Sequence, residues 1–208
     1  MVLSTSWKGV EAISEELRRI LGRKLQVIEQ QAGTGFKFLS EEFLGNPASV
    51  LVGTRTFWTG VSFEGFSCVV TVVEKMPFPS PGDAIVGAKN DAANARRPGS
   101  GFGEVSLPIA LRQIEQGVGR AIRTERDLAL VMVPDPRLNP NDENKKSYHR
   151  DFRNSIPNMP TVDKAGALAW VSEIARLAKL DEEAEEAEPE IETEEEDQGR
   201  AMIFEDVA

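Results

Sequence analysis

The chain has 208 residues, of which 40% are hydrophobic, enough for one sizeable α/β domain and an extra segment. Its net charge of −10 is unevenly divided: residues 181–208 hold 14 acids and one base, which leaves +3 on residues 1–180. No run approaches the roughly 18 apolar residues of a membrane span, the first residues lack the basic stretch of a signal peptide, and a single cysteine excludes an internal disulfide. We expect a cytoplasmic protein without a membrane partner.

The first part of the chain predicts alternating strands and helices. Clusters of β-branched and apolar residues predict strands at residues 1–5, 25–28, 48–53 and 67–73. Ser6 is placed to cap a helix that runs to about Leu21, and a short amphipathic helix is predicted at residues 36–44. We interpret Cys68 as a small buried residue of the fourth strand.

The second part of the chain begins with a break in this pattern. Residues 76–103 contain four prolines and five glycines, which predicts a long ordered or semi-mobile insertion, with residues 99–103 as a flexible loop. Beyond it we expect a strand at residues 128–133 and helices at residues 106–119, 144–155 and 163–179. Residues 181–208 are too acidic to offset the entropy of ordering by burial, so we predict that they are disordered.

Strands that alternate with helices, several of them apolar throughout, predict an α/β fold with a mainly parallel sheet and helices on both faces. We assign this domain to residues 1–180 and the acidic tail to residues 181–208. Because the chain begins inside a predicted strand, we expect that an upstream domain is either cut away or not encoded. The mildly basic body is compatible with nucleic-acid binding.

The motif most suggestive of chemistry is Gln116-x-x-Gly119-Arg120-x-x-Arg123. Two arginines three residues apart on a helical turn point the same way, and their planar guanidinium groups match phosphate oxygens. Developing charge on a transferring phosphoryl group is stabilised by such a cation. The alternative is a basic helical turn on a solvated face.

A second motif, residues 53–62, follows the third predicted strand and reads Gly-Thr-Arg-Thr-Phe-Trp-Thr-Gly-Val-Ser. Ligands of parallel sheets bind at the carboxyl ends of strands, which is where this motif lies. Phe57 and Trp58 have two open interpretations. Either the rings pack in the core, or one or both lie near a DNA-facing or interdomain surface.

Together the two motifs resemble the second RecA-like domain of XPD/DinG-type superfamily 2 DNA helicases. The first is similar to the family's Gln-x-x-Gly-Arg-x-x-Arg, and the second to its Gly-Thr-x-Ser-Phe-Trp-Glu-Gly-Val-Asp. Thr56, Thr59 and Ser62 replace the family's Ser, Glu and Asp. Glu64, which would face the same side of a strand as Ser62, is the candidate substitute for that Asp. Further similar stretches, in the family's order, lie at residues 2–7, 72–79, 106–108, 127–137 and 148–157.

The resemblance implies a motor that binds ATP between two RecA-like domains and moves single-stranded DNA with 5′ to 3′ polarity. ATP and Mg²⁺ would be bound mainly by a first RecA-like domain, supplied in cis or in trans. Arg123 is the implied arginine finger, with Arg120 as the second catalytic arginine. The implied nucleotide-binding residues are Gln116, Gly119, Arg120, Arg123, Gly60 and Ser62. The implied DNA-binding residues are Ser4, Thr5, Ser6, Thr54, Thr56 and Trp58.

The phosphate-binding motif Gly-x-x-x-x-Gly-Lys-Ser/Thr and the motif Asp-Glu-x-His occur nowhere in the chain, and no metal ligands are expected. We therefore predict that the chain alone is inactive as an ATPase. Two alternatives stay open. The chain could be one subunit of a split enzyme, or a degenerate, non-catalytic module that binds DNA or a partner.

Overall fold

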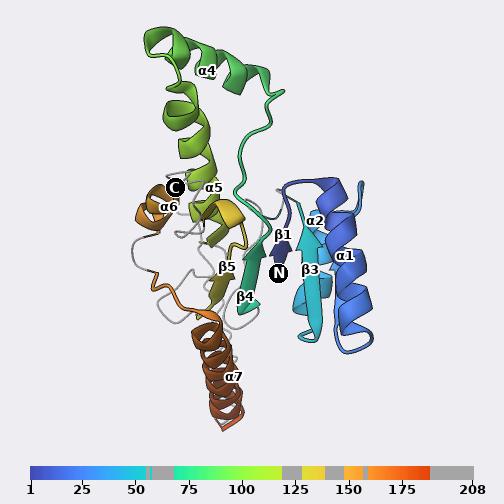
Figure 1. The fold of residues 1–208 in the computed structure, drawn as a ribbon. Helices are drawn as coiled ribbons and strands as arrows, with labels where there is room; N and C mark the ends of the chain where they lie inside the picture. Colours follow the sequence, from blue (N-terminus) through green and yellow to red (C-terminus); the bar gives the residue numbers. More distant parts are fainter. Residues whose placement is uncertain (55–56, 58–67, 119–127, 139–147, 157–158, 188–208) are drawn as a thin grey trace, which may run out of the picture.

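The computed structural model describes residues 1–54, 57, 68–118, 128–138, 148–156 and 159–187, and all structural statements refer to these (Figure 1). The elements in chain order are β1 (Val2–Leu3), α1 (Trp7–Leu21), β2 (Gln26–Glu29), α2 (Phe36–Leu44), β3 (Ser49–Gly53), β4 (Val70–Val73), α4 (Ala84–Arg96), the π-helical turn η2 (Phe102–Ser106), α5 (Leu107–Val118), β5 (Leu130–Met132), the 3-10 turn η3 (Pro136–Leu138), α6 (Tyr148–Ser155) and α7 (Lys164–Ala187).

The five strands form one sheet in the order β2-β3-β1-β4-β5, and every neighbouring pair is parallel. In the centre of the sheet, Leu3 is in register with Gly53 on one side and Val73 on the other. Because all strands point the same way, their carboxyl ends meet at a single edge, which we call the carboxyl edge. The predicted parallel α/β fold is confirmed.

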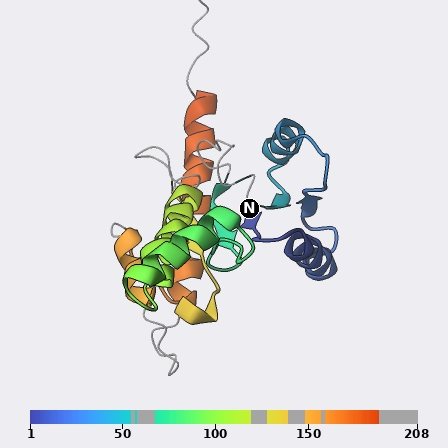
Figure 2. The same cartoon turned by 90° about the horizontal axis from the view of Figure 1, so that it is seen from above.

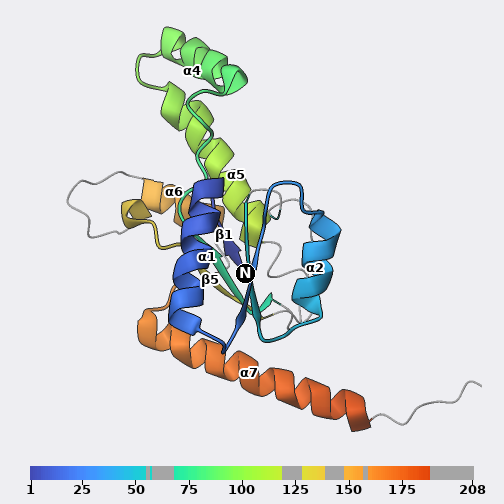
Figure 3. The same ribbon diagram turned by 90° about the vertical axis from the view of Figure 1, so that its right-hand side faces the viewer.

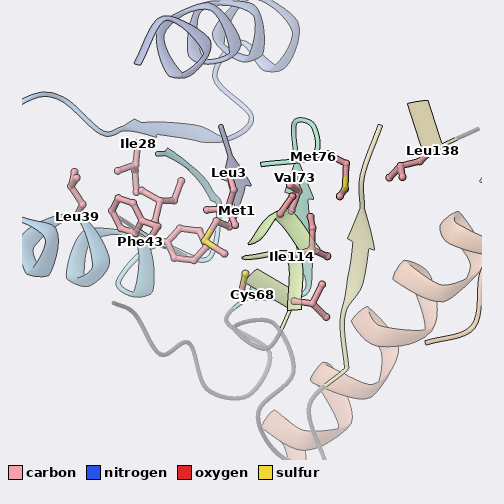
Figure 4. Packing of buried hydrophobic residues seen from close by; sticks show 14 of the residues in the cluster. Met1, Leu3, Ile28, Leu39, Phe43, Cys68, Val73, Met76, Ile114 and Leu138 are labelled. Carbon is pink, nitrogen blue, oxygen red and sulfur yellow. The ribbon is translucent and has the colours of Figure 1, made fainter. Parts of the chain in front are cut away.

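Side chains alternate between the two faces of the sheet, as they must in extended strands. Val2, Val52 and Val72 pack with Val10 of α1 on one face. Leu3, Leu51 and Val73 belong to the larger cluster on the other face, together with Leu39 and Phe43 of α2 and Ile114 of α5 (Figure 4). Seen from above, α1 and α2 lie on opposite sides of the strands (Figure 2).

The first two helices have the bounds that the sequence predicts. Helix α1 begins after Ser6, whose hydroxyl oxygen accepts a hydrogen bond from the Gly9 N–H at 3.1 Å. It ends at Gly22, which has a φ of 58° that favours glycine. Helix α2 spans Phe36–Leu44 and turns Leu39 and Phe43 toward the sheet.

The predicted insertion at residues 76–103 is ordered in its central part, where it forms helix α4, a helix that the sequence pattern does not predict. The prolines and all but one of the glycines lie outside α4, at Pro77, Pro79, Pro81 and Gly82 before it, and at Pro98, Gly99, Gly101 and Gly103 after it. Asp83 caps the helix by accepting hydrogen bonds from the N–H groups of Ile85 and Val86. Helix α4 stands clear of the sheet and buries only Ala93 (Figure 3). Its sequence therefore has only a weak hydrophobic periodicity, which is why the pattern does not predict it.

Three other predicted boundaries also shift. The predicted loop at residues 99–103 ends at Gly101, since Phe102 begins the turn η2 that leads into α5. Strand β4 begins at Val70, so Cys68 is buried just before the strand and not within it. Helix α7 continues through Ala187, so residues 181–187 are helical, which suits a run of Ala and Glu without proline. Residues 188–208 lie outside the described residues.

Within the described part of the chain, no helix combines the length and the apolar character needed to cross a membrane.

Candidate nucleic-acid interface at the carboxyl edge

A row of polar side chains follows the strands at the carboxyl edge. In the order of the sheet these are Gln30 after β2, Thr54 after β3, Ser4 after β1, Glu74 after β4, and Asp135 beyond β5. Four of the five are buried, and Glu74 keeps 26% of its side chain exposed. Ligands of parallel α/β sheets bind at this edge. The hydrogen bonds of these residues therefore decide which polar groups are available to a ligand there.

Ser4 is fully buried, and its hydroxyl lies 2.7 Å from the Glu74 carboxylate. The same carboxylate oxygen accepts a hydrogen bond from the Thr5 N–H at 3.2 Å, and Lys75 lies 3.2 Å from the other oxygen. Burial raises the pKa of the Glu74 carboxyl, but hydrogen bonds from Ser4, Thr5 and Lys75 outweigh it, and the pKa is lowered. Glu74 is therefore an anion at neutral pH.

Thr5 and Ser6 are exposed, unlike Ser4. They form the turn between β1 and α1, at the carboxyl edge and next to the first N–H groups of α1. The Ser6 hydroxyl oxygen accepts the Gly9 N–H, which leaves its proton available to an acceptor outside. Of the predicted DNA-binding residues that are described, these two present side chains to solvent.

Thr54 is buried at the end of β3 and is bonded to Gln30. The Thr54 N–H and hydroxyl both donate to the Gln30 side-chain oxygen, at 2.6 and 2.9 Å. The Thr54 carbonyl accepts the Phe57 N–H at 3.0 Å. The Thr54 hydroxyl proton is thus used in a hydrogen bond within the protein.

Phe57 is fully buried, and its ring lies 4.9 Å from that of Phe36, centroid to centroid. A Cβ atom on Gly53 would overlap the Phe57 ring, which explains why glycine begins this motif. For Phe57, packing in the core is confirmed as the correct interpretation of the two. Trp58 lies outside the described residues.

Asp135 joins the stretch after β4 to the turn after β5. Its carboxylate accepts the Met76 N–H at 2.9 Å and pairs with Arg137 at 2.6 Å. Burial raises the pKa of the Asp135 carboxyl, but the hydrogen bonds from Arg137 and Met76 outweigh it and hold the pKa below its ordinary value. The Arg137 guanidinium also lies 5.2 Å from the centre of the Phe78 ring. This network fixes residues 75–79 beside β5.

Gln116, the first residue of the Gln-x-x-Gly-Arg-x-x-Arg motif, is exposed on the last turn of α5. Ile114 and Val118 on the same turns are buried and anchor the helix in the core. Gln116 is one of the residues that line an open groove of about 610 Å³ between α4 and α5. The groove is lined by Lys89, Ala92, Arg96, Glu104, Val105, Pro108, Ile109, Arg112, Gln113 and Gln116.

The other predicted site residues lie outside the described residues and stay predictions. They are Thr56, Trp58, Gly60, Ser62, Gly119, Arg120 and Arg123. Gln30, Glu74 and Asp135 are not among the site residues predicted from the sequence. A usable signal existed, because each is a polar residue shortly after an apolar strand of a parallel sheet.

Comparisons with known proteins agree with this architecture. The model of a family described as "Helicase C-terminal domain" matches residues 1–159. The ATP-dependent DNA helicase YoaA of Escherichia coli (strain K12) is 30% identical over 172 residues, covering 82% of this chain and 26% of YoaA. The ATP-dependent helicase DinG of Mycobacterium tuberculosis (strain ATCC 25177 / H37Ra) is 30% identical over 182 residues, covering 88% of this chain and 26% of DinG.

The chain thus spans about a quarter of the length of these relatives. A solved structure of an XPD helicase superposes with a TM-score of 0.51 at 16% identity, covering 76% of this chain and 26% of that one, which shows a shared fold. The chain belongs to the helicase C-terminal domain family, as the RecA-like C-terminal domain of an XPD/DinG-like helicase.

Proposed function

We propose that this chain is the C-terminal motor half of an ATP-dependent DNA helicase. In this proposal ATP binds between the chain and a first RecA-like domain, present in cis or in trans. Arg120 and Arg123 reach the β- and γ-phosphates from this side, and Arg123 acts as the arginine finger. ATP and Mg²⁺ are bound mainly by the first domain.

The observation that carries the proposal is the anchoring of α5. Ile114 is fully buried in the core, while Gln116 is exposed two residues later. In the sequence the two arginines follow Gln116 by four and seven residues, and the helix that carries Gln116 is held in place by its packing. An arginine finger needs such a rigid support, because its effect on rate depends on its position relative to the transferring phosphoryl group.

The proposed single-stranded DNA surface lies at the carboxyl edge. Thr5 and Ser6 are exposed there and are proposed to contact the phosphate backbone. Ser4 and Thr54 are buried and hydrogen-bonded to Glu74 and Gln30. We therefore propose that Ser4 and Thr54 contribute by shaping the edge. Thr56 and Trp58 remain proposed contacts.

The experiment is a comparison of ATP hydrolysis by the chain alone and by the chain joined to a first motor domain. Alone, with single-stranded DNA and Mg-ATP, the chain should release phosphate only at the background rate, because it lacks the phosphate-binding loop. Joined to a domain that carries the loop, it should support DNA-stimulated turnover. Turnover by the chain alone that is lost on mutating one of its own residues would overturn the proposal.

A further inference from the structure

The Glu74 carboxylate bonds to the turn that carries two of the proposed DNA-contacting residues. One oxygen, Oε2, accepts hydrogen bonds from both the Ser4 hydroxyl at 2.7 Å and the Thr5 N–H at 3.2 Å. The backbone holds the two segments side by side, since the Glu74 N–H donates to the Leu3 carbonyl at 2.9 Å. Glu74 thus reaches across from the end of β4 to the end of β1.

Gly9 is a second, independent indication that the fold accommodates the contact between Ser4 and Glu74. A Cβ atom on Gly9 would overlap the Ser4 hydroxyl oxygen and lie 3.1 Å from Glu74 Oε2. Gly9 is in the first turn of α1, although glycine is a poor helix former. Only the absence of a side chain lets Ser4 and Glu74 approach the helix this closely.

A negative charge beside a DNA-binding turn opposes binding of the phosphate backbone. Lys75 offsets part of the charge, since its amino group lies 3.2 Å from Glu74 Oε1. What the carboxylate supplies is a fixed acceptor for the Ser4 hydroxyl and the Thr5 N–H. With both donors held, the side chains of Thr5 and Ser6 point out of a turn of defined shape.

We propose that Glu74 is a positioning residue of the single-stranded DNA site: it fixes the turn at residues 4–6 so that Thr5 and Ser6 face the DNA backbone. This inference rests on the proposed function, because it assigns a role toward the same DNA surface. Glu74 itself makes no DNA contact. Its role is that of a hydrogen-bond acceptor, and its charge is incidental.

Three variants of the full chain separate these roles. Glu74→Ala removes the acceptor. Glu74→Gln keeps it, because both bonds go to one oxygen that an amide carbonyl can replace, while the negative charge is lost. Glu29→Ala is the matched control, since Glu29 ends β2 at the same edge and pairs with Arg18 at 2.7 Å, away from the turn. Thermal unfolding of each variant identifies any that fail to fold.

The first measurement is hydrogen exchange at the Thr5 amide, without DNA. Exchange should accelerate several-fold in Glu74→Ala and stay near the wild-type rate in Glu74→Gln and Glu29→Ala. Equal exchange in wild type and Glu74→Ala would show that the carboxylate does not hold the turn and would overturn the inference.

The second measurement is the affinity for a fluorescently labelled oligothymidylate. Glu74→Ala should bind several-fold more weakly, while Glu74→Gln and Glu29→Ala should bind at least as tightly as wild type. Tighter binding by Glu74→Ala, or equal weakening in Glu74→Gln, would overturn the inference. Failure of the wild type to bind, with the expected exchange pattern, would overturn the proposed DNA surface and leave the role of Glu74 in holding the turn confirmed.

Discussion

Gln30 and Thr54 are joined by two hydrogen bonds to one oxygen, from the Thr54 N–H at 2.6 Å and the Thr54 hydroxyl at 2.9 Å. Both residues are buried, and they connect the end of the edge strand β2 to the end of β3. A single side chain therefore satisfies both donors of Thr54 at a position where water is excluded.

Replacing Gln30 should show how much the stability of the fold depends on its bonds to Thr54. Gln30→Ala leaves the buried Thr54 N–H and hydroxyl without their acceptor, so we expect the free energy of unfolding to fall by about 1–3 kcal/mol in urea denaturation. The control is Gln26→Ala, whose hydrogen bonds to Glu42 and Asn46 are exposed. It should stay within about 0.5 kcal/mol of wild type. Equal losses in the two variants would contradict this account of Gln30.

Asp135 should make stability depend on pH in the acid range. The pKa of Asp135 is lowered in the folded chain, so the unfolded chain takes up the proton more readily. The stabilisation is present above the ordinary pKa of about 3.9 and is lost as pH falls toward the folded value. Wild type should therefore lose stability as the pH falls below about 4, so that it is less stable at about pH 3 than at pH 7.

The variant Asp135→Asn should be less stable at pH 7, because it loses the ion pair with Arg137, and it should lose less on acidification. Asp91→Asn, a change on the exposed surface of α4, should show the same difference in the free energy of unfolding between pH 7 and about pH 3 as wild type. Urea denaturation at pH 7 and at about pH 3 measures the loss of stability on acidification. A loss in Asp135→Asn equal to that of wild type would exclude Asp135 as its cause.

The sequence predicts elements that local patterns determine. Trp7–Leu21 has a capping serine and a strong apolar periodicity, and Phe36–Leu44 has an apolar face, so both helices are predicted with correct bounds. Helix α4 is missed because it buries little, and the carboxyl-edge contacts are missed for a different reason. Ser4 and Glu74 are 70 residues apart, and only the strand order brings them together.

The acidic segment at the end of the chain should weaken DNA binding by competing for the same surface. Residues 188–208 carry nine acids and one base, a net charge of −8, and deleting them leaves α7 whole. A tethered anionic segment acts at high effective concentration. We expect the deletion to tighten single-stranded DNA binding several-fold at low salt, with the gain shrinking near about 0.3 M salt.

The control for this deletion is a chain in which residues 188–208 are replaced by a neutral Gly/Ser segment of equal length. It should bind like the deletion, because the effect comes from charge. Equal affinities of the deletion and the wild type at low salt would indicate that the segment serves solubility alone.

The most direct test of the motor-half account is the turnover number of Arg123→Ala in the two-domain motor. If Arg123 stabilises the charge on the transferring phosphoryl group, kcat should fall by about 10³-fold or more, while the Kd for nucleotide changes far less. Arg150→Ala, which removes an exposed arginine of α6, should leave kcat unchanged. A kcat of Arg123→Ala equal to that of wild type would contradict the account and leave Arg120 as the candidate finger.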